Sequence, residues 1–134
     1  MSTYATGTFE IDSWDEKPYD EREGARLARA QVRKTFRVDV EGESTTELLL
    51  AYAQEGSAAY AGFERFVGRG HGRSGGFILH YSESGDREIA EQVAALSVVP
   101  NSGTGELRGV CGTANVTVGT DGGHTFTVDY HFES

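Results

Sequence analysis

The feature that most constrains this chain is an alternation of apolar and polar side chains between residues 28 and 40. Such a period of two is typical of a β-strand with one face buried and the other in water. One position breaks the pattern, because Lys34 falls on the face that should be dry, between Val32 and Phe36. The segment therefore predicts a strand that points a cation into the protein interior.

The composition suits one all-β domain over residues 1–134. Eighteen glycines and only two prolines, with glycine spread between apolar runs, indicate many turns and bulges. The formal net charge of −9 argues against nucleic acid or an anionic membrane as a partner. No apolar run approaches the ~20 residues that cross a bilayer, and no signal peptide is visible. Because Cys111 is the only cysteine, we expect a cytoplasmic protein without a disulfide.

Segments with β-like character recur along the chain and are separated by turn signals. We expect strands at about 3–14, 28–40, 44–53, 58–68, 77–83, 87–99, 110–118 and 124–132. Turns are predicted at 41–43, 55–56 and 84–86, and longer connections at 15–24, 69–76 and 100–109. Eight sequential strands predict an up-and-down barrel or a sandwich. An eight-stranded barrel has room inside for side chains or for one small ligand.

The segment at 87–99 is ambiguous, because Ile89, Val93 and Leu96 recur at helical spacing. Its alanine and glutamate content also favours a helix. The local signals alone therefore leave helix and strand open for this segment.

Six segments resemble a known family: ATGTFEIDSWDEKPYDE, KTFRVDVEGEST, GFERFVG, GRSGGFIL, VVPNSGTGELRGV and the closing YHFE. They resemble a bacterial family of unknown function whose members are similar to allene oxide cyclase. The resemblance implies a closed eight-stranded antiparallel up-and-down barrel, and it favours a strand at 87–99. Allene oxide cyclase isomerises an apolar epoxide inside its barrel, but none of its catalytic residues has a matching motif here. Leu96 and small residues stand where the family tends to have a tryptophan-containing strand, which would allow a roomier cavity.

Two motifs that suggest cofactor or nucleophile chemistry lack the structural context this chemistry needs. Gly70, Gly72 and Gly75 spell G-x-G-x-x-G between two strands, whereas a dinucleotide site needs a helix N-terminus at that place. Ser74 has no nucleophile elbow around it. We therefore predict a glycine-rich hairpin and no cofactor.

The histidines and the single cysteine do not predict a metal site. A cupin-like centre would place two histidines one residue apart on a strand, whereas His71, His80, His124 and His131 are scattered. The parity of the strands places His80 and His131 on outer faces. Cys111 is expected to be a structural cysteine. We predict no metal ion.

Aromatic side chains are predicted to line the interior. Four tyrosines fall on strand faces rich in apolar residues, and a buried tyrosine usually finds a partner for its hydroxyl group. They either pack in the core or line a pocket for a partly polar ligand. Trp14 is either a lid over the barrel mouth or an aromatic plug. The predicted ligand-contacting residues are Trp14, Phe36, Tyr52, Tyr60, Phe66, Tyr81, Phe126 and Tyr130.

Glu64 is the predicted partner of Lys34, with Glu43 as the second choice. Glu64 and Phe66 share one face of their strand, and that face is taken as the interior because Arg65 then reaches water. Two strand spacings of ~4.8 Å separate the two backbones by roughly 10 Å, which long side chains can cross. The pair is either a structural ion pair or the polar end of a pocket, where both residues would act as catalytic acid and base.

Three classes of function follow from these features. The leading hypothesis is a barrel that binds a small apolar or partly polar molecule and promotes its isomerisation or cyclisation without a cofactor. The close alternative is a non-catalytic carrier of the lipocalin kind. The third is an inert barrel that binds a partner through its acidic surface. A homodimer is also expected, because Leu49 and Phe63 lie on outer faces that need cover.

Overall fold

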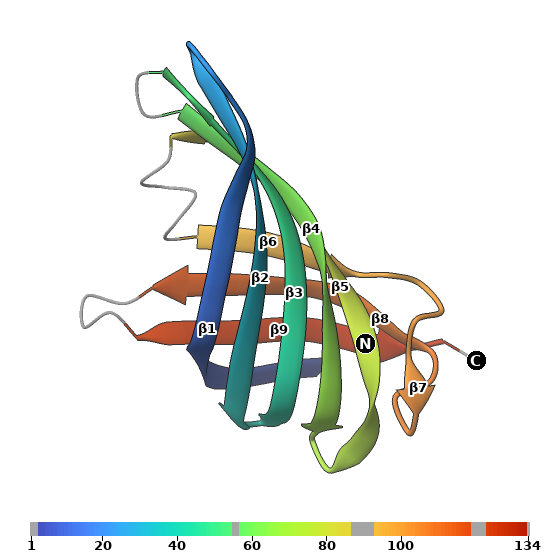
Figure 1. Cartoon of the computed structure of the whole chain (residues 1–134). Helices are drawn as coiled ribbons and strands as arrows, with labels where there is room; N and C mark the ends of the chain where they lie inside the picture. Colours follow the sequence, from blue (N-terminus) through green and yellow to red (C-terminus); the bar gives the residue numbers. More distant parts are fainter. Residues whose placement is uncertain (1–2, 55–56, 87–92, 119–122, 134) are drawn as a thin grey trace.

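The computed structural model describes residues 3–54, 57–86, 93–118 and 123–133. Within these ranges the protein is all-β, and its strands form one antiparallel sheet (Figure 1). The nine strands are β1 (Thr3–Arg22), β2 (Ala25–Val38), β3 (Val40–Ala53), β4 (Ser57–Gly70), β5 (Arg73–Asp86), β6 (Val93–Val98), β7 (Thr104–Gly105), β8 (Val110–Val118) and β9 (His124–Phe132). No helix in the described ranges is long and apolar enough to span a membrane.

The hydrogen-bonded pairings of eight strands run in a ring. Each strand from β1 to β5 pairs with the next, and the sequence of pairings continues through β6, β8 and β9 back to β1. The short β7 lies within the connection predicted at 100–109 and pairs with β5 outside this ring. In Figure 1 the strands β1–β4 run side by side, and β6, β8 and β9 cross behind them at a steep angle. We call the eight strands the strand ring, and its buried side the inner face.

Several of the predicted strands agree with the structure. The strands predicted at 110–118 and 124–132 have the same bounds as β8 and β9. Residues 93–98 of the ambiguous segment form β6, so this part is a strand as predicted. Residues 87–92 and the turn predicted at 55–56 lie outside the described residues.

The loop predicted at 15–24 is wrong, because β1 continues to Arg22. This part of β1 forms a long ribbon with β2, and the pairing shifts its register between Pro18 and Asp20. Among the described strands, β9 pairs with β1 only as far as Phe9, so the other edge of β1 has no strand beside it further on. A bulge and an edge are the places where a sheet tolerates proline, and this explains why the ribbon continues.

Two predicted turns are also wrong. The turn predicted at 41–43 lies instead at Asp39, between β2 and β3, and Val38 at the end of β2 has a φ of 86°. Gly42 lies within β3, where a Cβ atom would be 2.4 Å from a carbonyl oxygen of β4. The glycine therefore serves a close approach of two strands rather than a turn. The turn predicted at 84–86 is part of β5.

The inner face has two halves of different character. The half towards Asp39, here called the phenylalanine half, is packed with aromatic rings. The Phe36 ring lies at its centre, with the rings of Phe9, Phe66 and Phe126 at centroid distances of 5.2, 5.5 and 5.3 Å. The opposite half, here called the tyrosine half, is lined by small residues between leucines and tyrosines. Its lining includes Ala28, Ala30, Leu48, Leu50, Tyr52, Tyr60 and Gly62.

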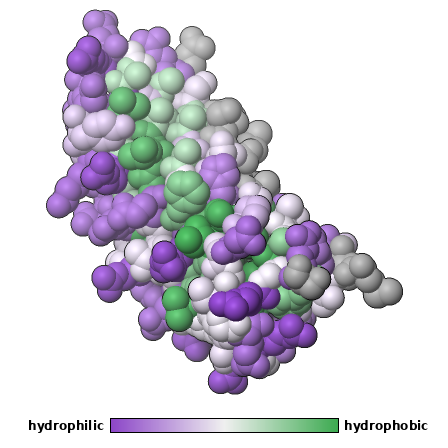
Figure 2. Space-filling view, turned by 90° about the vertical axis from the view of Figure 1, so that its right-hand side faces the viewer, coloured by the Kyte–Doolittle hydropathy of each residue, from purple (hydrophilic) through white to green (hydrophobic). Residues whose placement is uncertain are grey.

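Large apolar side chains also lie on the outside of the ring. Leu49 and Phe63 are on the outer face as predicted and are exposed by 50% and 56%. Figure 2 shows apolar side chains in a band among polar ones, on the side of the molecule that lies to the right in Figure 1. Cover of the outer face by a second copy of the chain stays a prediction.

Because β3 and β4 approach closely, adding a single methyl group between them is expected to lower the stability of the fold. A Cβ atom at Gly62 would lie 2.0 Å from the carbonyl oxygen of Glu47, whereas one at Gly70 would have nothing within 4 Å. Gly62→Ala is therefore expected to lower the free energy of unfolding by about 1–3 kcal/mol. Gly70→Ala, on the same strand, is the control and should have almost no effect. Urea unfolding measures both, and equal midpoints would contradict the close approach.

Candidate functional site

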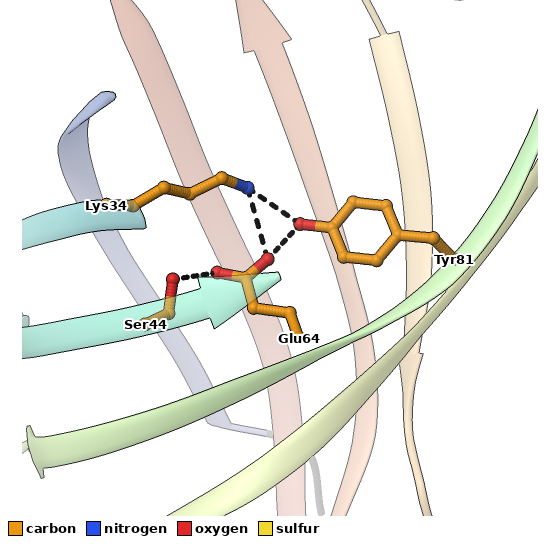
Figure 3. Close-up of polar contacts among 4 residues, drawn as sticks. All are labelled: Lys34, Ser44, Glu64 and Tyr81. Carbon is orange, nitrogen blue, oxygen red and sulfur yellow. Dashed lines mark hydrogen bonds and ion pairs between the residues drawn. The ribbon is translucent and has the colours of Figure 1, made fainter. Parts of the chain in front are cut away.

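Lys34 and Glu64 form an ion pair on the inner face (Figure 3). Lys34 lies on β2 and Glu64 on β4, with β3 between them, and Nζ donates to Oε1 over 3.1 Å. Lys34 is 8% exposed and Glu64 is completely buried. The predicted inward positions and the predicted contact are therefore both present, while Glu43, the second choice as partner, lies exposed on β3. The catalytic role of the pair stays a prediction.

Two hydroxyl groups complete the surroundings of the carboxylate. Tyr81 of β5 donates to Oε1 of Glu64 and accepts a hydrogen bond of 2.9 Å from Nζ of Lys34. Ser44 of β3 donates to Oε2 over 2.5 Å (Figure 3). Gly62, directly opposite Tyr81, has no side chain and leaves space for the tyrosine ring. Four neighbouring strands thus each contribute one member of a polar cluster, which we define as Lys34, Ser44, Glu64 and Tyr81.

The protonation of Tyr81 follows from its surroundings. Burial raises the pKa of Tyr81 well above its ordinary value, and the negative charge of Glu64 raises it further. The phenol therefore keeps its proton at neutral pH and donates it to Glu64 in a hydrogen bond. Sequence reasoning placed Tyr81 among the ligand-contacting residues, but it missed Ser44 and the link from Tyr81 to the ion pair.

Aromatic rings lie close to the charge of Lys34. Its Nζ is 4.8 Å from the centre of the Phe9 ring and 5.2 Å from that of Tyr81. The faces of such rings attract a cation. His124 packs against Phe9 with ring centroids 4.8 Å apart, and burial lowers the pKa of His124, with the charge of Lys34 adding to the shift. His124 is therefore neutral at pH 7, and Lys34 is the cation of this region.

One buried hydroxyl group beside the polar cluster has no hydrogen-bond partner among the described residues. This is Oγ1 of Thr46, a residue that is 1% exposed. Thr46 lies directly opposite Glu64 and two residues after Ser44, so it shares their inner face. Leaving a buried hydroxyl group unpaired costs about 1–3 kcal/mol. The polar cluster thus has a neighbouring hydrogen-bonding position that the described side chains and backbone do not use.

The inner face is open to solvent near the polar cluster. Ile11 pairs with Lys34 and Trp14 pairs with Val32, so their side chains are on the same face of the sheet as these buried residues. Nevertheless Ile11 and Trp14 are exposed by 38% and 48%. The reason is that β9 leaves β1 after Phe9, and no other described strand covers the ribbon there.

Trp14 and Tyr52 meet at the rim of this open side. Nε1 of Trp14 donates to a carboxylate oxygen of Glu16 over 3.0 Å, and the Tyr52 hydroxyl donates to the same carboxylate over 3.0 Å. Arg26 lies 4.6 Å from the centre of the Tyr52 ring. Trp14 is therefore a half-exposed rim residue and does not plug the interior. Tyr60 is partly buried nearby, with its ring 6.4 Å from that of Tyr81.

The remaining predicted aromatic residues do not lie at the open side. Phe36, Phe66 and Phe126 are buried in the phenylalanine half, where Phe66 and Phe126 both pack against Phe36. Their role in the structure is core packing below the polar cluster.

The family model described as "Protein of unknown function (DUF3224)" matches residues 5–130. The chain belongs to this family. A crystal structure of a DUF3224 protein of unknown function from Shewanella oneidensis is similar to it, with 30% identity, a TM-score of 0.80 and coverage of 100% of both chains. No curated protein matches the chain. The predicted membership of a family of unknown function is confirmed, and the similarity to allene oxide cyclase stays a prediction.

Tyr130, the last of the predicted ligand-contacting residues, belongs to a separate group of side chains at the far end of the phenylalanine half. Its hydroxyl oxygen is 2.6 Å from Nδ1 of His71, whose Nε2 is 3.5 Å from a carboxylate oxygen of Asp39. The amide of Thr6 donates to the same carboxylate over 3.0 Å. Sequence reasoning missed this chain of contacts, because its members come from two turns, from β1 and from β9. No alternation pattern links such positions.

The histidines of the DUF3224 chain are distributed as expected, with His80 and His131 exposed on outer faces. However, His131 lies beside Cys111 and Glu133. The donor atoms of these three residues are within 4.8 Å of one another, and among the described residues this is the group that could hold a metal ion. The prediction of no metal site rested on spacing along the sequence, where this group is not visible.

The polar cluster predicts strong coupling between its two charges. Lys34→Met or Glu64→Leu alone leaves a buried charge unpaired and is expected to lower the free energy of unfolding by about 3–5 kcal/mol. The double variant should be clearly more stable than the sum of the two losses predicts. Urea unfolding of the four proteins gives the coupling energy. Additive losses would mean that the two side chains do not depend on each other.

The lowered pKa of Asp39 predicts that its contribution to the stability of the fold is lost in acid. The hydrogen bond from the Thr6 amide lowers the pKa of Asp39 below its ordinary value of 3.8, burial opposes this shift, and His71 adds to it. A depressed pKa means that this contribution is complete above the unfolded-state pKa and is lost as the pH falls through the folded-state value. Asp39→Asn should therefore lower Tm at pH 7, and this effect should disappear in acid once the pH falls below the lowered pKa of Asp39. Asp15→Asn, at an exposed site on β1, is the control. A Tm difference that is constant with pH would contradict the assignment.

Proposed function

We propose that this protein binds a small, largely apolar molecule in the tyrosine half of the inner face and isomerises or cyclises it without a cofactor. We further propose that the strand ring is a closed eight-stranded barrel similar to that of allene oxide cyclase. The observation that supports the binding site is the polar cluster, buried at the boundary of the two halves. Ligand pockets combine an apolar lining with a few converging polar groups.

The small side chains of the tyrosine half and the open side of the ring support this location of the binding site. Ala28, Ala30 and Gly62 occupy inner positions of β2 and β4 where larger residues would fill the tyrosine half. The exposed Ile11 and Trp14 mark a route from solvent to Lys34. A ligand that enters there would contact apolar side chains along its length and the polar cluster at one end. The unpaired hydroxyl group of Thr46 would gain a partner from the same polar end.

The chemistry that we propose needs only proton movements. Nζ of Lys34 would donate to an oxygen of the ligand and stabilise the negative charge that develops on it. The Glu64 carboxylate would take a proton from a neighbouring carbon and return it to another position. Tyr81, kept protonated by its raised pKa, would donate to whichever oxygen carries the charge. Such a sequence leaves the protein unchanged and requires no oxidant or reductant.

A non-catalytic carrier is the second candidate, and the same polar cluster supports it. A satisfied ion pair can orient the polar end of a ligand without moving protons. Incubating a bound molecule with the protein and analysing it afterwards separates the two candidates, because only the enzyme converts it. The free thiol of Cys111 suits the reducing cytoplasm that we propose as the location of the protein.

Lys34→Met provides the central test. Native mass spectrometry of freshly purified protein should show a bound small molecule in the wild type and at least about a tenfold loss of occupancy in the variant, since the polar end loses its donor. Arg33→Met is the matched control, because it removes a positive charge from the adjacent residue, whose side chain is exposed on the outer face. Retention of the ligand by Lys34→Met would show that this function is wrong.

Thr46→Val separates binding from stability. Removing an unpaired buried hydroxyl group should raise the free energy of unfolding by about 1 kcal/mol in the ligand-free protein. The same change should weaken ligand retention if the ligand is the missing partner. Unchanged retention in this variant would exclude a contact between Thr46 and the ligand.

A further inference from the structure

The ends of β8 and β9 bring together three side chains of different chemistry. Cys111 and His131 are direct cross-strand partners, so both side chains project from the same face of the sheet. Glu133 follows His131 by two positions, just beyond the end of β9. Nε2 of His131 is 3.6 Å from Oε1 of Glu133, and the three donor atoms lie within 4.8 Å of one another.

The backbone keeps this arrangement in place. The amide of Glu133 donates to the carbonyl oxygen of Gly109 over 2.8 Å, which ties the chain after β9 to the turn before Cys111. Gly109 has a φ of 86°, and a Cβ atom at this position would lie 2.3 Å from the carbonyl oxygen of Glu133. The glycine therefore permits the close approach that places the carboxylate beside the thiol and the imidazole.

The geometry points to a Zn²⁺-binding site formed by Cys111, His131 and Glu133. Zn²⁺ accepts sulfur, nitrogen and oxygen ligands in tetrahedral sites, at metal–ligand distances of about 2.0–2.3 Å. Ligand atoms in such a tetrahedron lie roughly 3.3–3.8 Å apart, and the 3.6 Å between His131 and Glu133 falls in this range. The side chains of His131 and Glu133 are exposed by 47% and 71%, which leaves them room to rotate towards the thiol when a metal ion binds.

The donor set selects the class of metal. A thiolate and an imidazole are poor ligands for Ca²⁺ and Mg²⁺, which prefer oxygen atoms, whereas they suit Zn²⁺ and its spectroscopic substitute Co²⁺. Three protein ligands leave the fourth tetrahedral position to water. The net charge of −9 favours the approach of a divalent cation to the surface. The site lies on the outer side of the sheet and is independent of the polar cluster and of the function proposed for it.

Co²⁺ provides a direct test, because a thiolate bound to Co²⁺ gives an intense near-ultraviolet charge-transfer band. Protein freed of metal with EDTA and kept reduced should bind one equivalent of Co²⁺ with this band, and Zn²⁺ should abolish it by competition. Cys111→Ser should remove the band, and His131→Ala and Glu133→Gln should each weaken Zn²⁺ binding at least about tenfold. His80→Ala, which removes another exposed histidine, is the control. All of these positions are at least partly exposed, and circular dichroism checks their folding.

Alkylation of the thiol gives a second measurement that does not depend on a spectrum. Zn²⁺ should slow the reaction of Cys111 with iodoacetamide at least about tenfold in the wild type and in His80→Ala, but not in His131→Ala. Co²⁺ binding without the charge-transfer band, or equal protection of the thiol in His131→Ala and the wild type, would overturn the site. So would a loss of affinity in His80→Ala as large as that in His131→Ala.

Discussion

The ion pair between Lys34 and Glu64 ties together the register of three strands. Lys34 faces Ser44 across β2 and β3, and Glu64 faces Thr46 across β3 and β4. A slip of one residue in either pairing would turn one of the two charges to the outer face. The partner left inside would then be a buried charge without compensation, which costs several kcal/mol. Tyr81 extends the same constraint to β5, because its hydroxyl group bonds to both members of the pair.

The sequence predicts the faces of the strands better than their ends. An alternation of period two decides which side chains share a face without reference to any other strand, and it places Lys34 correctly. Turn signals are weaker, because glycine and proline also serve contacts that only the folded chain creates. Gly42 suggests a turn and instead lets β3 approach β4, so the turn moves to Asp39. Pro18 suggests a loop and instead lies at a register shift, beside an edge of β1 that no described strand pairs with.

The same difference explains which parts of the candidate site could be predicted. Glu64 follows from the alternation in its own strand, together with the choice that sends Arg65 to water. Ser44 and Tyr81 join the polar cluster only through the register of β3 and β5 against β4, and that register depends on turns that the sequence predicts in the wrong places. The contact between Cys111 and His131 is hidden for the same reason. Residues far apart in the sequence become neighbours through pairing, and pairing is a property of the whole ring.

The constraint on strand register explains the polar cluster, but it does not explain the Thr46 hydroxyl group. A role in setting register accounts for Lys34, Ser44, Glu64 and Tyr81, since each has a hydrogen-bond partner within the cluster. It does not account for Thr46, whose hydroxyl group is buried opposite Glu64 and unpaired among the described residues. Valine would fill nearly the same space on β3 without the cost of an unpaired hydroxyl group. The function that we propose would account for this hydroxyl group, because a ligand held at the polar cluster would supply the missing bond. The open side of the ring and the small residues of the tyrosine half lie where such a molecule would enter.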